Sequence, residues 1–184
     1  MPKKYVVTGG PGTGKTTTLL ALSKEGYNVA LEVARPLIER HKNSGGPVPW
    51  SDAEAFHEFQ SILREKQMRL ESLFQKSESV FLDRGVIDSI AYYKARGVSP
   101  PEELYRVASN NRYERVFVTE MLPSYKTDSA RRENPKTARK IHAVIKETYA
   151  EFGYDVVSVP PFSVEKRVML IKTHVQKNLK YEMG

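Results

Sequence analysis

The chain has 184 residues, of which 40% are hydrophobic and 28% are charged, so it can bury the core of one domain. These proportions exclude a disordered or fibrous protein over most of the chain. The absence of cysteine excludes disulfides, thiolate catalysis and cysteine-ligated metal sites. The sequence lacks the run of about 18 apolar residues that a membrane span needs, and its start does not resemble a signal peptide. We therefore expect one cytoplasmic domain over residues 1–184.

The net charge of +7 favours acidic partners such as nucleotides, nucleic acid or an anionic membrane surface. Basic residues gather between residues 126 and 146 and again between 166 and 180. Both stretches are also typical of solvated helix faces.

Short β-branched runs alternate with longer segments of helical periodicity. Strands are predicted at residues 4–8, 27–32, 80–82, 115–119 and 155–159, and helices at 15–25, 34–42, 51–76, 86–96, 101–110, 138–152 and from 164 onward. Ser51, with Glu54 three residues later, predicts an N-terminal capping box. Buried strands that alternate with crossover helices predict an α/β fold with a five-stranded parallel sheet between two helical layers.

Residues 9–16 read GGPGTGKT and match the phosphate-loop pattern G-x-x-x-x-G-K-[ST] at every fixed position. Glycines let backbone N–H groups turn inward around phosphate oxygens, and the following helix adds its positive end. Lys15 is expected to reach the β- and γ-phosphates of a bound triphosphate, and the Thr16 hydroxyl to ligate Mg²⁺. The predicted nucleotide contacts are Gly9, Gly10, Pro11, Gly12, Thr13, Gly14, Lys15, Thr16 and Thr17.

Ligands of open α/β sheets lie at the carboxyl ends of the strands, which draws attention to Glu32 and to Asp83-Arg84. Asp83 ends an apolar run, as a carboxylate that holds Mg²⁺ does, although a helix-capping role is the alternative. Arg84 would lie beside phosphate or form an ordinary ion pair. Glu32 would accept the proton of an attacking hydroxyl, or would pair with Arg35. Asp88 would face a substrate pocket or would cap nothing.

The segment of residues 121–135 is polar, irregular and rich in arginine, which predicts a lid. Arg131 and Arg132 would stabilise charge on a transferring phosphoryl group, or would be solvated surface. The four histidines lack the spacing of metal ligands and are interpreted as structural or surface residues.

Five stretches of the chain resemble the NadR/Ttd-like AAA family of P-loop proteins over residues 4–172. They are VVTGGPGTGKTTTLLAL, LEVARPLIE, FLDRGVIDSIAYY, LPSYKTDSARRE and VVSVPPFSVEKR. The sequence is also similar to nucleoside and nucleotide kinases, whose base follows the second strand in a Glu-Pro-Val motif. Glu32-Val33 matches that motif without its proline, and Asp83-Arg84-Gly85 matches their Asp/Glu-Arg-Ser with glycine in place of serine. Their Arg-rich lid resembles residues 125–133.

The resemblance implies a P-loop NTPase fold like that of nucleoside and nucleotide kinases, with catalytic roles for Lys15, Glu32, Asp83, Arg84, Arg131 and Arg132. From the positions of these residues we also expect an acceptor site at Glu32, Arg35 and Asp88. We expect a Mg²⁺-dependent kinase that transfers phosphate from ATP to a nucleoside-like hydroxyl, with GTP left open. A nucleotide-dependent switch that docks on an anionic membrane or protein is the alternative, and a polynucleotide kinase is a third.

Overall fold

The computed structural model describes residues 2–31, 34, 36–38, 51–74, 79–123 and 134–181, with side chains as far as residue 176. The strands within these residues are β1 (Lys3–Thr8), β2 (Val29–Ala30), β3 (Ser79–Asp83), β4 (Arg115–Thr119) and β5 (Val156–Val159). The helices with assigned bounds are α1 (Lys15–Lys24), α3 (Ala53–Ser72), α4 (Val86–Arg96), α5 (Glu102–Asn110), α6 (Pro135–Glu151) and α7 (Val164–Tyr181).

The five strands form one parallel sheet in the order β2-β3-β1-β4-β5, which confirms the predicted fold class. β1 lies in the middle and pairs with β3 on one side and β4 on the other. The chain therefore fills one half of the sheet before it crosses to the other half. Ligands of open α/β sheets bind where the strand order reverses, outside the carboxyl ends of the strands. In this sheet that point is the carboxyl end of β1.

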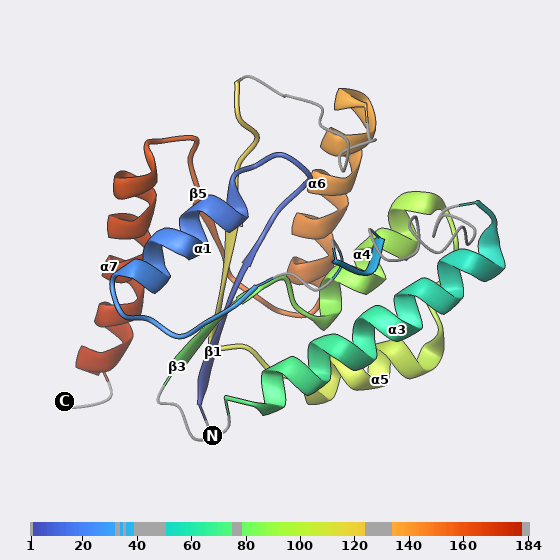
Figure 1. Cartoon of the computed structure of the whole chain (residues 1–184), viewed down its shortest axis with the longest axis horizontal. Coiled ribbons are helices and arrows are strands. Elements are labelled where there is room, and N and C mark those ends of the chain that lie inside the picture. The colour runs from blue at the N-terminus through green and yellow to red at the C-terminus, as the bar shows by residue number, and fades with distance from the viewer. Residues whose placement is uncertain are drawn as a thin grey trace.

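Helices cover both faces of the sheet, and Figure 1 shows α1 and α7 on one side and α3 to α6 on the other. Side chains of β1 alternate between the two cores, since Tyr5 and Val7 pack with α1 and α7 while Val6 packs with α4 and α6. None of the described helices has the length and the apolar character that a membrane crossing would need. The two cores pack against the two faces of the sheet and so support the loops at the carboxyl ends of its strands.

Several predicted boundaries differ from the structure, among them the starts of α3 and β2. The cap of α3 is Asp52, whose Oδ1 accepts the Ala55 N–H at 2.8 Å, so the predicted Ser51 cap is wrong by one residue. Ser51 instead donates its hydroxyl to Asp52 Oδ2 at 2.7 Å. Strand β2 begins at Val29 rather than at residue 27. Of the predicted helix over residues 34–42, residues 34 and 36–38 are described, and they are helical.

Candidate functional site

The phosphate-loop motif lies between β1 and α1, in the strand–loop–helix context that its sequence predicts. Gly9, Gly12 and Gly14 have φ angles of 134°, 78° and 83°, a region that side chains rarely adopt. At Gly9 there is no room for a side chain either, because an added Cβ would lie 2.6 Å from the carbonyl oxygen of Thr119. The loop conformation thus depends on glycine at these motif positions.

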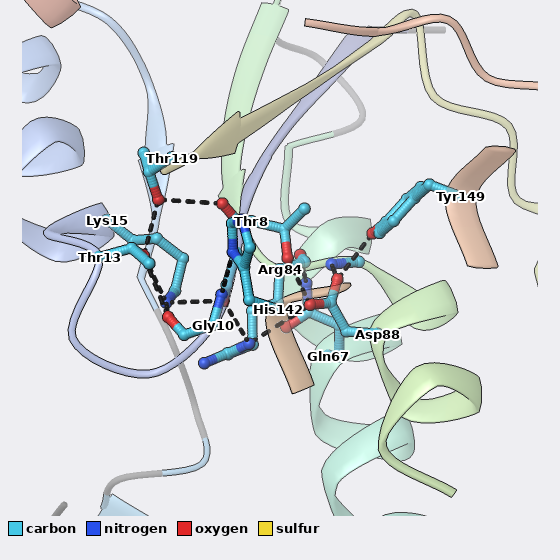
Figure 2. Close-up of polar contacts among 12 residues, drawn as sticks. Thr8, Gly10, Thr13, Lys15, Gln67, Arg84, Asp88, Thr119, His142 and Tyr149 are labelled. Atoms are coloured by element: carbon cyan, nitrogen blue, oxygen red, sulfur yellow. Dashed lines mark hydrogen bonds and ion pairs between the residues drawn. The ribbon is translucent and has the colours of Figure 1, made fainter. Parts of the chain in front are cut away.

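Lys15 is buried, with its ammonium folded over its own loop. Its Nζ donates to the carbonyl oxygens of Gly9 at 3.0 Å and Gly10 at 2.8 Å (Figure 2). The ammonium therefore lies inside the curve of the loop, where phosphate oxygens are expected. In the presence of a bound triphosphate, the Lys15 ammonium would donate to phosphate oxygens in place of these carbonyls.

The predicted metal ligands face each other across the sheet edge. The Thr16 hydroxyl donates to Asp83 Oδ2 at 3.3 Å, and Asp83 ends β3 with only 1% of its surface exposed. A hydroxyl and a carboxylate are hard oxygen ligands of the kind that Mg²⁺ binds together with phosphate oxygens and water. Elsewhere in the described residues, no three His, Cys, Asp or Glu side chains gather as a metal cage would require. This pair fits an ion held jointly by protein and nucleotide.

Arg84 follows Asp83 with a φ of 74°, a conformation that costs a non-glycine residue of the order of 1–3 kcal/mol. Its Nη1 lies 3.4 Å from the Gly9 carbonyl oxygen and 3.3 Å from Asp88 Oδ1 (Figure 2). Its own carbonyl accepts Gln67 Nε2 at 3.1 Å. The strained backbone directs the guanidinium toward the first glycine of the phosphate loop.

Asp88 lies on α4 with 3% exposure, and it caps that helix by accepting the Gly85 N–H at 3.0 Å. Tyr149 donates to the same carboxylate at 2.7 Å, and the Thr8 hydroxyl donates to its other oxygen. Of the two alternatives predicted for Asp88, the one in which it caps nothing is therefore wrong. Its direct contact with a substrate stays a prediction.

Four predicted site residues, Glu32, Arg35, Arg131 and Arg132, lie outside the described residues. Most of the predicted lid, residues 124–133, does so as well. Their roles remain predictions from the sequence.

Thr119, at the end of β4, supports the phosphate loop and was not predicted. Its hydroxyl lies 3.1 Å from the Thr8 carbonyl oxygen and 2.8 Å from Thr13 Oγ1. Thr13 Oγ1 in turn donates to the Gly10 carbonyl at 3.0 Å. A threonine at the end of a strand is common, so the sequence offers no signal that marks this one.

Glu120 follows Thr119 and receives three side-chain hydrogen bonds. Lys146 Nζ donates to Oε1 at 2.8 Å and Ser158 Oγ donates to it at 2.6 Å, while His142 Nε2 lies 2.8 Å from Oε2. Burial raises the pKa of this carboxyl, but the three contacts outweigh burial and lower the pKa to about 2. Glu120 is therefore ionised at neutral pH.

Arg167, from the basic C-terminal stretch, is 5% exposed and reaches the phosphate loop from α7. Its Nη1 donates to the Thr13 carbonyl at 3.0 Å, and its Nε donates to the Phe162 carbonyl at 2.8 Å. A Cβ on Gly14 would lie 2.6 Å from Nη1, so this glycine leaves space for the guanidinium. Periodicity does hint at this inward position, because Arg167 lies three residues after Val164 and four before Ile171 of the buried stripe.

Solved structures with this fold include kinases of nucleosides and nucleotides. Thymidylate kinase from Candida albicans is similar with a TM-score of 0.69 and 15% identity, covering 96% of this chain and 92% of that one. Deoxyadenosine kinase from M. mycoides with bound dATP gives a TM-score of 0.68 and 15% identity, covering 95% and 99%. NadR in complex with NR gives 0.66 and 20%, covering 86% of this chain and 43% of that one. At these identities the likeness shows the fold alone.

Among curated proteins, no sequence matches this chain significantly. The model of a protein family described as an AAA domain matches residues 4–167. The match begins in β1 and extends into α7, so it takes in the phosphate loop, Asp83-Arg84 and Arg167. The chain therefore belongs to the AAA-domain family of P-loop proteins, in agreement with the NadR-like resemblance of its sequence.

Proposed function

We propose that the protein is a kinase that binds ATP and transfers its γ-phosphate to the hydroxyl of a small, nucleoside-like acceptor. The observation that carries this proposal is the convergence of Lys15, Asp83 and Arg84 on one phosphate loop at the carboxyl edge of the sheet. Phosphoryl transfer depends mostly on positioning and on charge stabilisation, and a lysine, an arginine and a carboxylate supply both.

Each described residue takes a defined part. Loop amides and the N-terminus of α1 would hold the β-phosphate, and Lys15 would move from the Gly9 and Gly10 carbonyls to the β- and γ-oxygens. Arg84 lies close enough to Gly9 to meet charge that develops on the transferring group.

Thr16 and Asp83 would hold Mg²⁺, which when bound neutralises charge on the phosphate oxygens. Glu32 would take the proton of the acceptor hydroxyl, and Arg131 and Arg132 would close over the phosphates. The roles of Glu32, Arg131 and Arg132 rest on the sequence alone.

The similar solved structures support a nucleoside-like acceptor. They are kinases of deoxyadenosine and thymidylate, and NadR complexes that contain NR or, in another crystal, NAD and AMP-PNP. We therefore infer ATP as donor and a nucleoside, nucleotide or ribosylated base as acceptor.

The alternative of a switch docked on an anionic surface rests on the basic stretch of residues 166–180. Two of its cations are engaged within the protein, since Arg167 contacts the phosphate loop and Lys172 pairs with Glu25. The kinase therefore remains the favoured proposal.

The decisive experiment incubates the protein with ATP and Mg²⁺ against a panel of nucleosides, nucleotides and ribosylnicotinamide, and measures ADP release. Release that depends on one acceptor, with the phosphorylated product identified by mass spectrometry, supports the kinase. Lys15→Ala is the matched control and should lose both turnover and triphosphate affinity. If ADP release is the same with and without every acceptor, the kinase proposal is wrong and a nucleotide-dependent switch takes its place.

A further inference from the structure

We propose that His142 is a positioning residue of the phosphate loop, which holds the peptide of Gly10 from helix α6 while Glu120 fixes the imidazole. This inference rests on the proposed function, because it assigns His142 to the ATP site. Neither the sequence motifs nor the family match points to this residue.

The first step is the contact itself. The Gly10 N–H donates to His142 Nδ1 at 3.2 Å, and the histidine is 8% exposed (Figure 2). A Cβ on Gly10 would lie 2.9 Å from the Ala138 carbonyl oxygen and 2.9 Å from His142 Cβ. The Gly10 backbone therefore lies directly against α6, and a side chain at this position would collide with the helix.

The second step is the protonation of the imidazole. Because a backbone N–H can only donate, Nδ1 must present its lone pair, and the proton of the neutral ring must be on Nε2. Nε2 lies 2.8 Å from Oε2 of Glu120, a carboxylate whose pKa is lowered to about 2. Lys146 and Ser158 hold the other carboxylate oxygen. An ionised and anchored acceptor thus selects the tautomer that Gly10 requires.

The Gly10 peptide links His142 to the predicted catalytic lysine. The carbonyl of the same Gly10 residue accepts Lys15 Nζ at 2.8 Å and Thr13 Oγ1 at 3.0 Å. His142 holds the N–H side of Gly10, and Lys15 and Thr13 hold the carbonyl side. A displacement of Gly10 would therefore move the loop and the resting place of its lysine together. Preorganisation of this kind lowers the cost of binding phosphate.

The test compares two substitutions that each keep one half of the imidazole. In His142→Asn, Oδ1 occupies the position of Nδ1 and can still accept the Gly10 N–H, but the side chain no longer reaches Glu120. In His142→Gln, the amide reaches the position of Nε2 and Glu120, but no acceptor faces Gly10. Isothermal titration with ATP and Mg²⁺, without an acceptor, reports on the loop alone.

We expect His142→Gln to weaken ATP binding about five- to twentyfold, and His142→Asn to stay within about threefold of the wild type. A merely structural histidine predicts the reverse order or equal losses, because Glu120 would then be the contact that matters. Either of those results overturns the proposal. Melting temperatures of both variants show that the difference is not one of folding.

If His142→Gln does not fold, a second variant, Gly10→Ala, still tests the proposal. Gly10→Ala would force the loop away from Ala138 and His142, and is expected to weaken ATP binding by a similar factor. Unchanged affinity in a folded Gly10→Ala protein would also overturn the proposal. A wild-type protein that does not bind ATP contradicts the proposed function instead, so the two failures are distinct.

Discussion

At the scale of single residues, Arg84 has both a strained backbone and a predicted catalytic charge. Two substitutions distinguish the effect of the strain from the effect of the charge. Arg84→Ala and Arg84→Gly both remove the guanidinium, but only glycine relaxes the φ of 74°. We expect the glycine variant to be more stable than the alanine variant by about 1 kcal/mol. Urea unfolding of the two proteins measures this difference.

Turnover should respond differently from stability, because both Arg84 variants lack the same charge. A loss of more than about tenfold in kcat/KM, equal in the two proteins, is expected for an arginine that meets phosphate. Full turnover in either folded variant would contradict the catalytic role of Arg84 and leave its ion pair with Asp88 as a structural contact.

Glu32 is the predicted general base, and glutamine at this position keeps its size and polarity but cannot take a proton. Glu32→Gln should lower kcat by about 10²- to 10⁴-fold with little change in ATP affinity. The alternative, an ion pair with Arg35, predicts that Glu32→Gln and Arg35→Ala lower the melting temperature alike and leave turnover intact. Turnover and melting temperature are therefore measured on both variants.

Glu120 should make stability depend on acid. Its folded pKa of about 2 lies below the ordinary value of 4.5, so its stabilising effect is complete above pH 4.5 and disappears as the pH falls toward 2. Because a quarter of the side chain is exposed, water screens the contact, and we expect about 1–2 kcal/mol. The difference in unfolding free energy between wild type and Glu120→Gln should be largest near pH 6 and shrink below pH 4. A constant difference would contradict the pKa assignment.

At the scale of elements, the start of α3 offers a test of the corrected cap. Asp52→Ala removes the acceptor of the Ala55 N–H and is expected to cost about 1 kcal/mol. Ser51→Ala removes only a hydroxyl that donates to Asp52 and should cost less than half as much. Thermal unfolding measures the stability of the two variants. Equal losses of stability would contradict the assignment of Asp52 as the cap and favour Ser51.

Sequence periodicity predicted the elements well where a helix buries one apolar stripe or a strand is buried on both faces. Helix α4 and strand β4 have the predicted bounds for this reason. It was less accurate at α3, where Ser51 and Asp52 are both good capping residues and only the backbone path decides between them. Strand β2 covers only Val29–Ala30 of the predicted range 27–32, and it lies at an edge of the sheet, where it pairs with β3 alone.

At the scale of the whole molecule, the sequence predicted the parts of the site that local motifs encode. The phosphate loop and the Asp83-Arg84 pair each consist of consecutive residues, so each can be recognised from the sequence alone. Thr119, His142 and Arg167 reach the phosphate loop from β4, α6 and α7, across separations of 106 to 154 residues in the chain. Such contacts depend on how the sheet brings distant elements together, and single-sequence patterns do not carry that information.

At the same scale, the segment of residues 124–134 precedes α6 and is predicted to close over bound triphosphate. Its polar, arginine-rich composition can bury little apolar area, so we expect its order to come from charge pairing with bound triphosphate. Asn134, the last residue of the segment, caps α6, and His142 of the same helix accepts the Gly10 N–H.

Hydrogen exchange with and without a nonhydrolysable ATP analogue measures this closure. Amides of the segment should become protected with the analogue in the wild type, but much less in Lys15→Ala, which binds triphosphate weakly. The double substitution Arg131→Ala and Arg132→Ala should also lose the protection while it keeps most of the nucleotide affinity, because the loop itself is intact. Equal exchange with and without the analogue in the wild type would contradict the lid prediction, and Arg131 and Arg132 would then be surface residues. Lys15 and Arg84 would in that case be the residues that stabilise charge on the transferring phosphate.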